Sequence, residues 1–273
     1  MNREMIAKTE AFLKDTFATS TYLRNNPTDL DYRLEHSYRV ANIAKAITIQ
    51  NIPSILYGDS NKKLFLHIHG KMGCKEEAAR LAEIVCPKGY QVLSIDLPGH
   101  GERTGEMERF VPWEVVPELL AVYGFARQRW KKIDLYANSI GAYFSLLAFQ
   151  DVKLEKGLFV SPILDMEKLI RDMMGWAGVT QEQLQQAGEI PTAFGETLSW
   201  KYLTYAAEHR IARWDSPTAI LYAGQDHLTA RRTARDFAQR FGCMVTVMEN
   251  GEHWFHTEEQ LAVLDAWLHK EME

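Results

Sequence analysis

The sequence contains little cysteine and no long hydrophobic run, and each absence excludes a class of protein. Only three cysteines occur in 273 residues, Cys74, Cys86 and Cys243. Their spacing suits neither a disulfide framework nor a Cys-x-x-Cys metal site. The longest nearly apolar run, 140–149, is far shorter than the roughly 20 residues of a membrane-spanning helix. Charges interrupt the first 17 residues every few positions, unlike a signal peptide, so we expect a cytoplasmic protein with free thiols and no membrane span.

The sequence also lacks the basic excess that is typical of a nucleic-acid-binding protein. Its 31 Lys and Arg are outnumbered by 36 Asp and Glu, which gives a net charge of −5, so we expect no nucleic-acid partner. Hydrophobic residues make up 46% and charged residues 25% of the chain. These values are close to the average for globular proteins and exclude extended disorder and fibrous classes.

Short apolar stretches alternate with helical patterns over most of the chain, which predicts an α/β fold. Each apolar stretch ends in a loop rich in Gly, Pro, Asp, Asn or Ser, as buried strands do. The expected strands are Leu64–Ile68, Gln91–Ile95, Ile133–Tyr136, Gly157–Val160, Ala219–Tyr222 and Met244–Met248. The expected helices are Glu76–Val85, Pro112–Arg129, Ile140–Gln150, Thr229–Phe241 and Thr257–Met272. A mostly parallel central sheet flanked by helices follows, preceded by an antiparallel strand pair within Ile47–Tyr57 in which Pro53 marks an edge or a turn.

Two segments break this alternation and predict the domain organisation. Residues 1–46 are charged and helical in pattern and precede the first strand, so they are expected to form an N-terminal helical appendage. Residues 165–213 carry only helical patterns between two expected strands, which predicts a helical cap inserted into the main domain at 47–273.

Ser139 is the first candidate for chemistry, because it lies between an expected strand and an expected helix. It sits in A-N-S-I-G at 137–141, which resembles the G-x-S-x-G nucleophile elbow with a small Ala137 at the first position. A serine that only caps the following helix would have the same local pattern. The strand before it and the helix after it favour the nucleophile.

An acid and a base follow Ser139 at later strand ends. Asp226 comes directly after the strand expected at Ala219–Tyr222, and His253 follows the last expected strand by a short loop. Asp226 could orient an imidazole or could cap the next helix. His256 is an alternative base, but His253 lies nearer the strand end. The order Ser, Asp, His is that of the α/β-hydrolase arrangement.

Backbone N–H groups near Ser139 predict an oxyanion hole. The glycine-rich H-G-K-M-G loop at 69–73 follows an expected strand, so we assign one donor to the N–H of Lys71 and the other to that of Ile140. The ammonium group of Lys71 is not expected to take part in stabilising the oxyanion. His67 and His69 point the same way along their strand, but no third metal ligand is evident, and no metal or cofactor is expected. The tight turn at 96–101 is expected to support the site structurally.

These motifs resemble the α/β-hydrolase superfamily over residues 47–273, most of all its serine esterase, lipase and acylaminoacyl-peptidase-like branches. The resemblance implies an α/β-hydrolase fold with a cap after the sixth strand, and a serine hydrolase that cleaves carboxylic esters of small or medium acyl groups through Ser139, His253 and Asp226. A thioesterase, a peptidase with the same triad and a non-catalytic ligand-binding protein stay open. The apolar side chains of the cap are expected either to form a wall of a pocket for an acyl or aryl group or to pack as ordinary core. They are Met166, Met173, Met174, Trp176, Phe194, Trp200 and Tyr202.

A second resemblance concerns the N-terminal segment. Residues 31–44 are similar to the first metal-ligand helix of HD-type phosphohydrolases, in which His36 would bind a metal. The His-Asp dipeptide of that family is missing from the chain, so we expect a structural appendage here. A homodimer formed through such helices or through an edge strand of the sheet is an open alternative.

Overall fold

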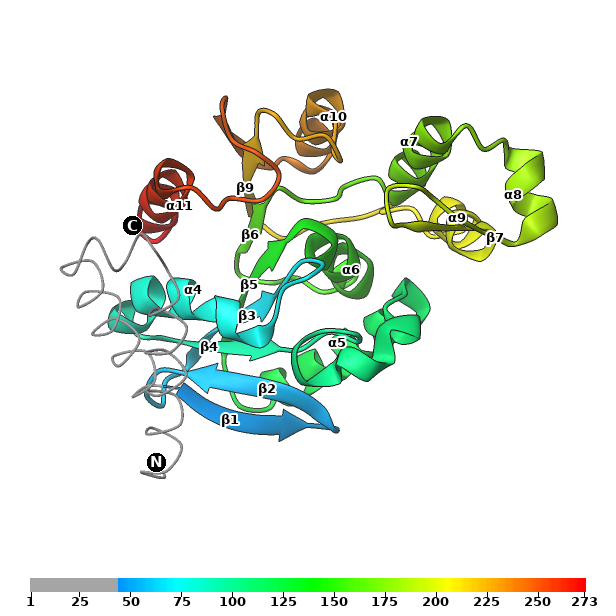
Figure 1. Cartoon of the computed structure of the whole chain (residues 1–273). Coiled ribbons are helices and arrows are strands. Elements are labelled where there is room, and N and C mark those ends of the chain that lie inside the picture. Colours follow the sequence, from blue (N-terminus) through cyan, green and yellow to red (C-terminus); the bar gives the residue numbers. More distant parts are fainter. Residues whose placement is uncertain (1–43) are drawn as a thin grey trace, which may run out of the picture.

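A computed structural model describes residues 44–273, which form an eight-stranded sheet covered by helices (Figure 1). The strand order is β1-β2-β4-β3-β5-β6-β9-β10, and the six strands from β4 to β10 run parallel. The fold predicted from the sequence is confirmed. Most of the predicted N-terminal appendage, including His36, lies outside the described residues. The sheet strands are β1 (Ala44–Ile49), β2 (Ile52–Tyr57), β3 (Lys63–Ile68), β4 (Tyr90–Ile95), β5 (Lys132–Asn138), β6 (Gly157–Val160), β9 (Thr218–Ala223) and β10 (Met244–Met248).

The first two strands form the expected antiparallel hairpin at one edge of the sheet. Its two-residue turn has positive φ angles of 49° at Gln50 and 71° at Asn51, as a type I′ turn requires. Pro53 lies inside β2, opposite Thr48. Its carbonyl faces β4, where it accepts a hydrogen bond from the N–H of Asp96 at 3.0 Å. The N–H and C=O of one strand residue point to the same side, so the missing N–H of this proline does not interrupt the pairing of β1 with β2.

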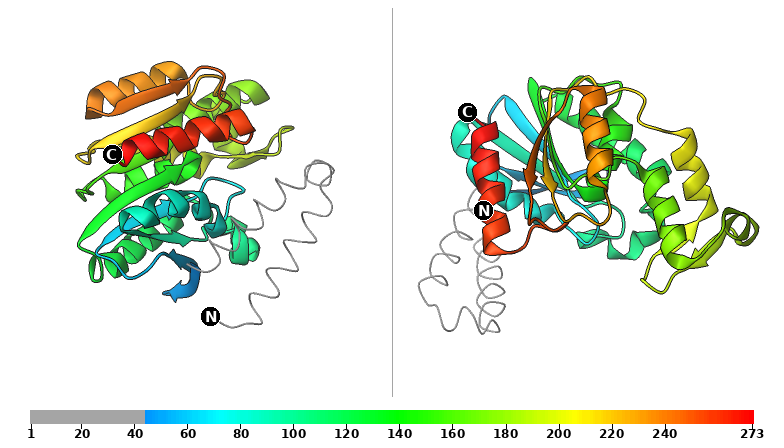
Figure 2. Two further views of the ribbon diagram at one scale, coloured as in Figure 1. Left: turned by 90° about the vertical axis from the view of Figure 1, so that its left-hand side faces the viewer. Right: turned by 90° about the horizontal axis from the view of Figure 1, so that it is seen from above.

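Helices cover both faces of the sheet and bury two separate hydrophobic clusters. Helices α4 and α11 cover one face, and α5, α6 and α10 cover the other (Figure 2). Helix α6 is almost fully buried, since all nine of its residues from Gly141 onwards are buried, and it contributes many side chains to the larger cluster. The helices are α4 (Ala78–Val85), α5 (Pro112–Arg127), α6 (Ser139–Phe149), α10 (Arg231–Phe241) and α11 (Glu258–Glu271), with short 3-10 helices at Lys75–Glu77, Cys86–Lys88 and Gly101–Arg109.

The segment 165–213, called the cap segment below, lies beyond the carboxyl ends of the parallel strands (Figure 1). Its three helices agree with the helical pattern of the sequence. A small antiparallel hairpin, β7 with β8, was not expected, because the sequence carries only helical patterns in this segment. The elements are α7 (Met166–Ala177), α8 (Gln181–Ala187), β7 (Glu189–Pro191), β8 (Thr197–Ser199) and α9 (Trp200–Glu208).

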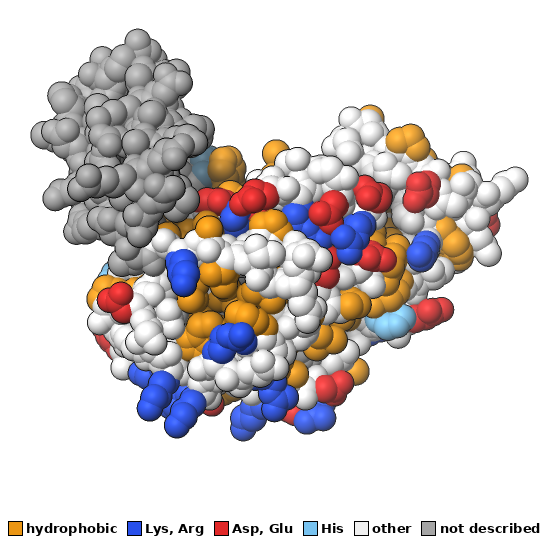
Figure 3. All heavy atoms as spheres, turned by 90° about the horizontal axis from the view of Figure 1, so that it is seen from below, with side chains coloured by type: hydrophobic (Ala, Val, Ile, Leu, Met, Phe, Trp, Pro, Cys, Tyr) orange, Lys and Arg blue, Asp and Glu red, His pale blue; other side chains and the backbone are white. Residues whose placement is uncertain are grey.

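The surface carries charges of both signs. On the face seen from below, basic, acidic and hydrophobic side chains are interspersed (Figure 3). Within residues 44–273 no helix is both long and apolar enough to cross a membrane. Cys74, Cys86 and Cys243 are partly buried and unpaired.

Candidate active site

Ser139 occupies a sharp turn between β5 and α6. Its φ angle of 48° is unusual for a residue other than glycine and marks local backbone strain. Gly141 permits the turn to pack closely, because a Cβ placed there would lie 2.3 Å from the carbonyl oxygen of His69. Ala137 is fully buried two residues before Ser139, so the fold accommodates a methyl group where a glycine is usual.

The side chains of Ser139, His253 and Asp226 form one hydrogen-bonded chain. The Oγ of Ser139 lies 2.8 Å from Nε2 of His253, and Nδ1 of His253 lies 2.8 Å from Oδ2 of Asp226. Ser139 and His253 are 114 residues apart in sequence. The loops after β5, β9 and β10 bring the three groups together, because parallel strands end at the same edge of the sheet.

Asp226 both orients His253 and holds the next segment of backbone. Its Oδ1 accepts hydrogen bonds from the N–H groups of Leu228 at 2.8 Å and Thr229 at 3.0 Å. Its side chain is 0% exposed, whereas that of His253 is 13% exposed. Helix α10 begins at Arg231 and has no side-chain cap, so Asp226 contacts His253 and holds the loop before that helix but does not cap it.

His256 does not replace His253. Its Nδ1 lies 2.8 Å from the carbonyl oxygen of Trp254, and its side chain is 38% exposed. The imidazole that meets Ser139 is that of His253, as the shorter distance from the strand end predicted.

The loop after β3 lies directly against Ser139. A Cβ built on Gly70 would come within 3.2 Å of the Cβ of Ser139. The N–H of Met72 donates to Nε2 of His100 at 2.9 Å and is therefore engaged. Lys71, the loop donor expected from the sequence, lies between Gly70 and Met72 in this segment.

His69 holds this loop in its neutral form, and His67, in the strand before the loop, is also buried. Nε2 of His69 accepts the N–H of Leu97 at 3.0 Å, and Nδ1 of His69 lies 2.7 Å from the carbonyl oxygen of Gly70. A carbonyl only accepts, so Nδ1 must carry the proton. Burial lowers the pKa of His69 to about 4 and that of His67 to about 3. Among the described residues, no group of three or more His, Cys, Asp or Glu is placed to hold a metal ion.

The side chain of Lys71 reaches the cap segment. Its Nζ lies 2.5 Å from Oε1 of Glu196, which is in the turn between β7 and β8. The two side chains are about equally exposed, at 41% and 39%. The ammonium group of Lys71 therefore links the loop beside Ser139 to the cap segment, and that it takes no part in the chemistry stays a prediction. The sequence carries no signal for this pair, which is separated by 125 residues.

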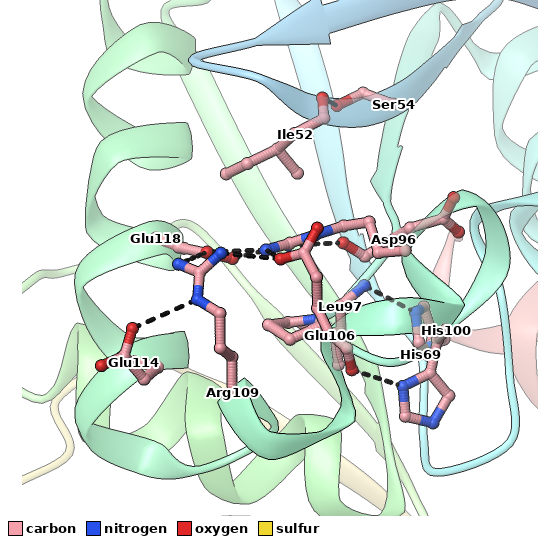
Figure 4. A network of polar contacts seen from close by, with 12 residues as sticks. Ile52, Ser54, His69, Asp96, Leu97, His100, Glu106, Arg109, Glu114 and Glu118 are labelled. Carbon is pink, nitrogen blue, oxygen red and sulfur yellow. Dashed lines mark hydrogen bonds and ion pairs between the residues drawn. The ribbon is translucent and has the colours of Figure 1, made fainter.

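A buried charge network supports the turn at 96–101 (Figure 4). The side chain of Asp96 is fully buried and pairs with Nζ of Lys75 at 2.7 Å. Arg103, also buried, donates to the carbonyl oxygen of Asp96 at 3.1 Å and to both carboxylate oxygens of Glu118. These contacts fix the turn against the loop after β3, where the ring of His100 lies 5.2 Å from that of His69.

The fold and this arrangement of residues define an α/β hydrolase. The model of the alpha/beta hydrolase family matches residues 65–266, and the chain belongs to that family. No curated protein matches the chain significantly by sequence.

Solved structures share the fold at low sequence identity. Est1E from Butyrivibrio proteoclasticus, in a structure with ferulic acid bound, is 19% identical with a TM-score of 0.69, over 84% of this chain and 98% of Est1E. Alpha/beta hydrolase domain-containing protein 10 from mouse is 13% identical with a TM-score of 0.68, over 84% and 98% of the two chains. An esterase from Pyrococcus furiosus is 15% identical with a TM-score of 0.56, over 84% and 88%.

Proposed function

We propose that this hydrolase is a serine esterase that cleaves carboxylic esters of small or medium acyl groups. The observation that carries the proposal is the chain of two hydrogen bonds, each 2.8 Å long, from Ser139 through His253 to Asp226. A serine in contact with an imidazole that is itself held by a carboxylate is the arrangement of an activated nucleophile. The esterases among the similar structures support the same reaction class.

The geometry allows each group a separate role. Ser139 attacks the ester carbonyl while Nε2 of His253 takes its proton and later delivers that proton to the leaving alcohol. Asp226 keeps the proton of His253 on Nδ1, so that Nε2 is free to act as the base. Water then attacks the acyl-enzyme by the same route and releases the acid.

The oxyanion of the tetrahedral intermediate would lie between two backbone donors. Lys71 supplies one N–H from the loop after β3, and Ile140 supplies the other from the first turn of α6. The N-terminus of this helix favours negative charge. Each such donor contributes on the order of 3 kcal/mol to the stability of the transition state.

The test compares two serines that have similar backbone conformations. Ser161, directly after β6, also has a positive φ angle, 43°, but it is buried whereas Ser139 is partly exposed, and its hydroxyl has no hydrogen-bond partner among the described residues. Ser139→Ala should abolish both turnover of short 4-nitrophenyl esters and labelling by a fluorophosphonate probe, with the melting temperature nearly unchanged. Ser161→Ala should keep both. Equal activity in Ser139→Ala would exclude this mechanism.

The same assay separates the alternatives. Faster turnover of acyl-CoA thioesters than of oxygen esters would make the protein a thioesterase, and faster turnover of amides would make it a peptidase. A folded wild-type protein that neither turns over an acyl substrate nor reacts with the probe would be a non-catalytic member of the fold.

A further inference from the structure

The ion pair between Lys71 and Glu196 joins the cap segment to the loop beside Ser139. Nζ of Lys71 lies 2.5 Å from Oε1 of Glu196, in the turn between β7 and β8. Gly70, the neighbour of Lys71, lies so close to Ser139 that a Cβ built on it would come within 3.2 Å of the Cβ of that serine. A carboxylate of the cap segment is therefore connected through one side chain to backbone that contacts the candidate nucleophile.

The strand order places Ser139 between two attachments of the cap segment to the core. The cap segment leaves the core after β6 and reaches the loop after β3 through Glu196. Strand β5, which ends directly before Ser139, pairs with β3 on one side and with β6 on the other. Because parallel strands end at the same edge of the sheet, the cap segment extends past the end of β5.

The two sides of the ion pair are anchored differently. Thr192 fixes the carbonyl oxygen of Glu196 with two hydrogen bonds, from its N–H at 2.8 Å and from its Oγ1 at 2.7 Å. Leu198, two residues later, is buried in the larger hydrophobic cluster. By contrast, Met72 next to Lys71 is 91% exposed and has a positive φ angle of 65°. The loop after β3 therefore has little packing of its own here, and the cap segment offers it a fixed point.

Other contacts hold the cap segment against the core independently of this ion pair. The ring of Trp113, at the start of α5, lies 5.9 Å from that of Tyr202 on α9. Nζ of Lys201, also on α9, lies 4.0 Å from the centre of the Trp113 ring. Loss of the ion pair should therefore leave the cap segment docked and act on the loop.

We propose that Glu196 is a positioning residue, which holds the loop after β3 in place through the side chain of Lys71. This inference rests on the proposed esterase function and adds a residue to it. The loop carries the N–H of Lys71, the proposed oxyanion donor, and such a donor stabilises the transition state only when it is correctly placed. An ion pair as exposed as this one contributes modestly, so we expect a several-fold effect on rate and not the loss that follows removal of the nucleophile.

The experiment measures kcat and KM on 4-nitrophenyl butyrate. In Glu196→Gln, which keeps the size of the side chain but loses its charge, kcat should fall about three- to five-fold. KM should be nearly unchanged, because the lost contact acts on the transition state. Lys71→Gln keeps the backbone N–H and should have the same effect. The double variant should be no slower than either single variant, because both substitutions remove one interaction.

Two further measurements separate positioning from a general structural effect. At roughly 1 M sodium chloride, the kcat of the wild-type protein should approach that of Glu196→Gln, because salt screens exposed charges. The control is Asp172→Asn on α7, whose carboxylate is 40% exposed and pairs with Lys168 within the same helix. It should leave kcat unchanged, and the melting temperatures of all these variants should be close to that of the wild-type protein.

Each other outcome has a defined meaning. An unchanged kcat in Glu196→Gln overturns the positioning role, and so does a rise in KM alone, because Glu196 then contributes only to substrate binding. A higher kcat also overturns it, since the pair would then hinder the reaction. Additive losses in the double variant mean that the two side chains act separately. Labelling of Ser139 by the fluorophosphonate with equal turnover in all variants rejects only the role of Glu196. Absence of labelling and turnover in the wild-type protein rejects the proposed function itself.

Discussion

The backbone N–H of Met72 donates to Nε2 of His100, and this 2.9 Å hydrogen bond joins the loop after β3 to the turn after β4. Nδ1 of His100 lies 2.8 Å from the carbonyl oxygen of Pro98, so Nδ1 carries the proton and Nε2 is the acceptor. Met72 has a positive φ angle of 65°, a conformation that costs energy for a residue with a side chain. His100 therefore holds the loop that presents the N–H of Lys71.

Removal of this acceptor should slow the reaction without abolishing substrate binding. His100→Phe keeps an aromatic ring against Phe110, whose ring lies 4.5 Å away, but leaves the N–H of Met72 unpaired. We expect kcat on short esters to fall by about ten-fold or more, since the proposed oxyanion donor, the N–H of Lys71, is no longer held in place, with a smaller change in KM. His100→Gln offers an amide oxygen and should recover part of kcat. If kcat is unchanged in His100→Phe, the loop does not depend on this bond.

Replacement of Asp226 by an amide should affect the reaction far more than the fold. Asp226→Asn keeps the size of the side chain but loses the charge that keeps the proton of His253 on Nδ1. We expect kcat to fall by roughly three to four orders of magnitude. The control is Asp236→Asn on α10, where the carboxylate is 62% exposed, and it should leave kcat unchanged. A change in melting temperature alone for Asp226→Asn would mean that this carboxylate serves only to hold the backbone of Leu228 and Thr229.

Gly141 should tolerate no side chain. In Gly141→Ala the new methyl group would meet the carbonyl oxygens of His69 and Ile68 at 2.3 and 2.7 Å, which forces the turn of Ser139 away from β3. We expect the free energy of unfolding to fall by more than about 2 kcal/mol, as measured by urea denaturation. Gly124 on α5 is the control, because a Cβ there has no neighbour within 4 Å. Gly124→Ala should stabilise the protein by up to about 1 kcal/mol. Equal unfolding energies for the two variants would contradict this prediction.

The buried imidazole of His67 should make stability depend on pH. Burial lowers its pKa from 6.5 to about 3, so the unfolded chain binds more protons than the folded protein at pH values between these two. Stability therefore falls as the pH drops below about 6.5. His67→Asn retains a polar group facing Ser94, whose Oγ lies 2.9 Å from Nδ1, but does not titrate. Between pH 7 and pH 5 the wild-type protein should lose roughly 1–2 kcal/mol more stability than the variant. Parallel stability curves would contradict this expectation.

The core strands and their loops follow closely from local patterns. The strands predicted at Gly157–Val160 and Met244–Met248 have the observed bounds, because a short apolar run between loop residues has few other structures available. The hairpin of β7 and β8 was not predicted. Its strands are only three residues long, too short for a hydrophobic alternation to be recognised. The contact of their turn with Lys71 depends on how the cap segment folds back.

The sequence by itself determined that this protein is an α/β hydrolase, and it indicated Ser139, Asp226 and His253 as the residues for chemistry. That was possible because strand ends and tight turns are encoded by neighbouring residues, and parallel strands place their ends at one edge. Only the tertiary structure decided that Glu196 meets Lys71. This pair joins the core to the cap segment across a long stretch of chain, and packing alone sets the distance between such segments.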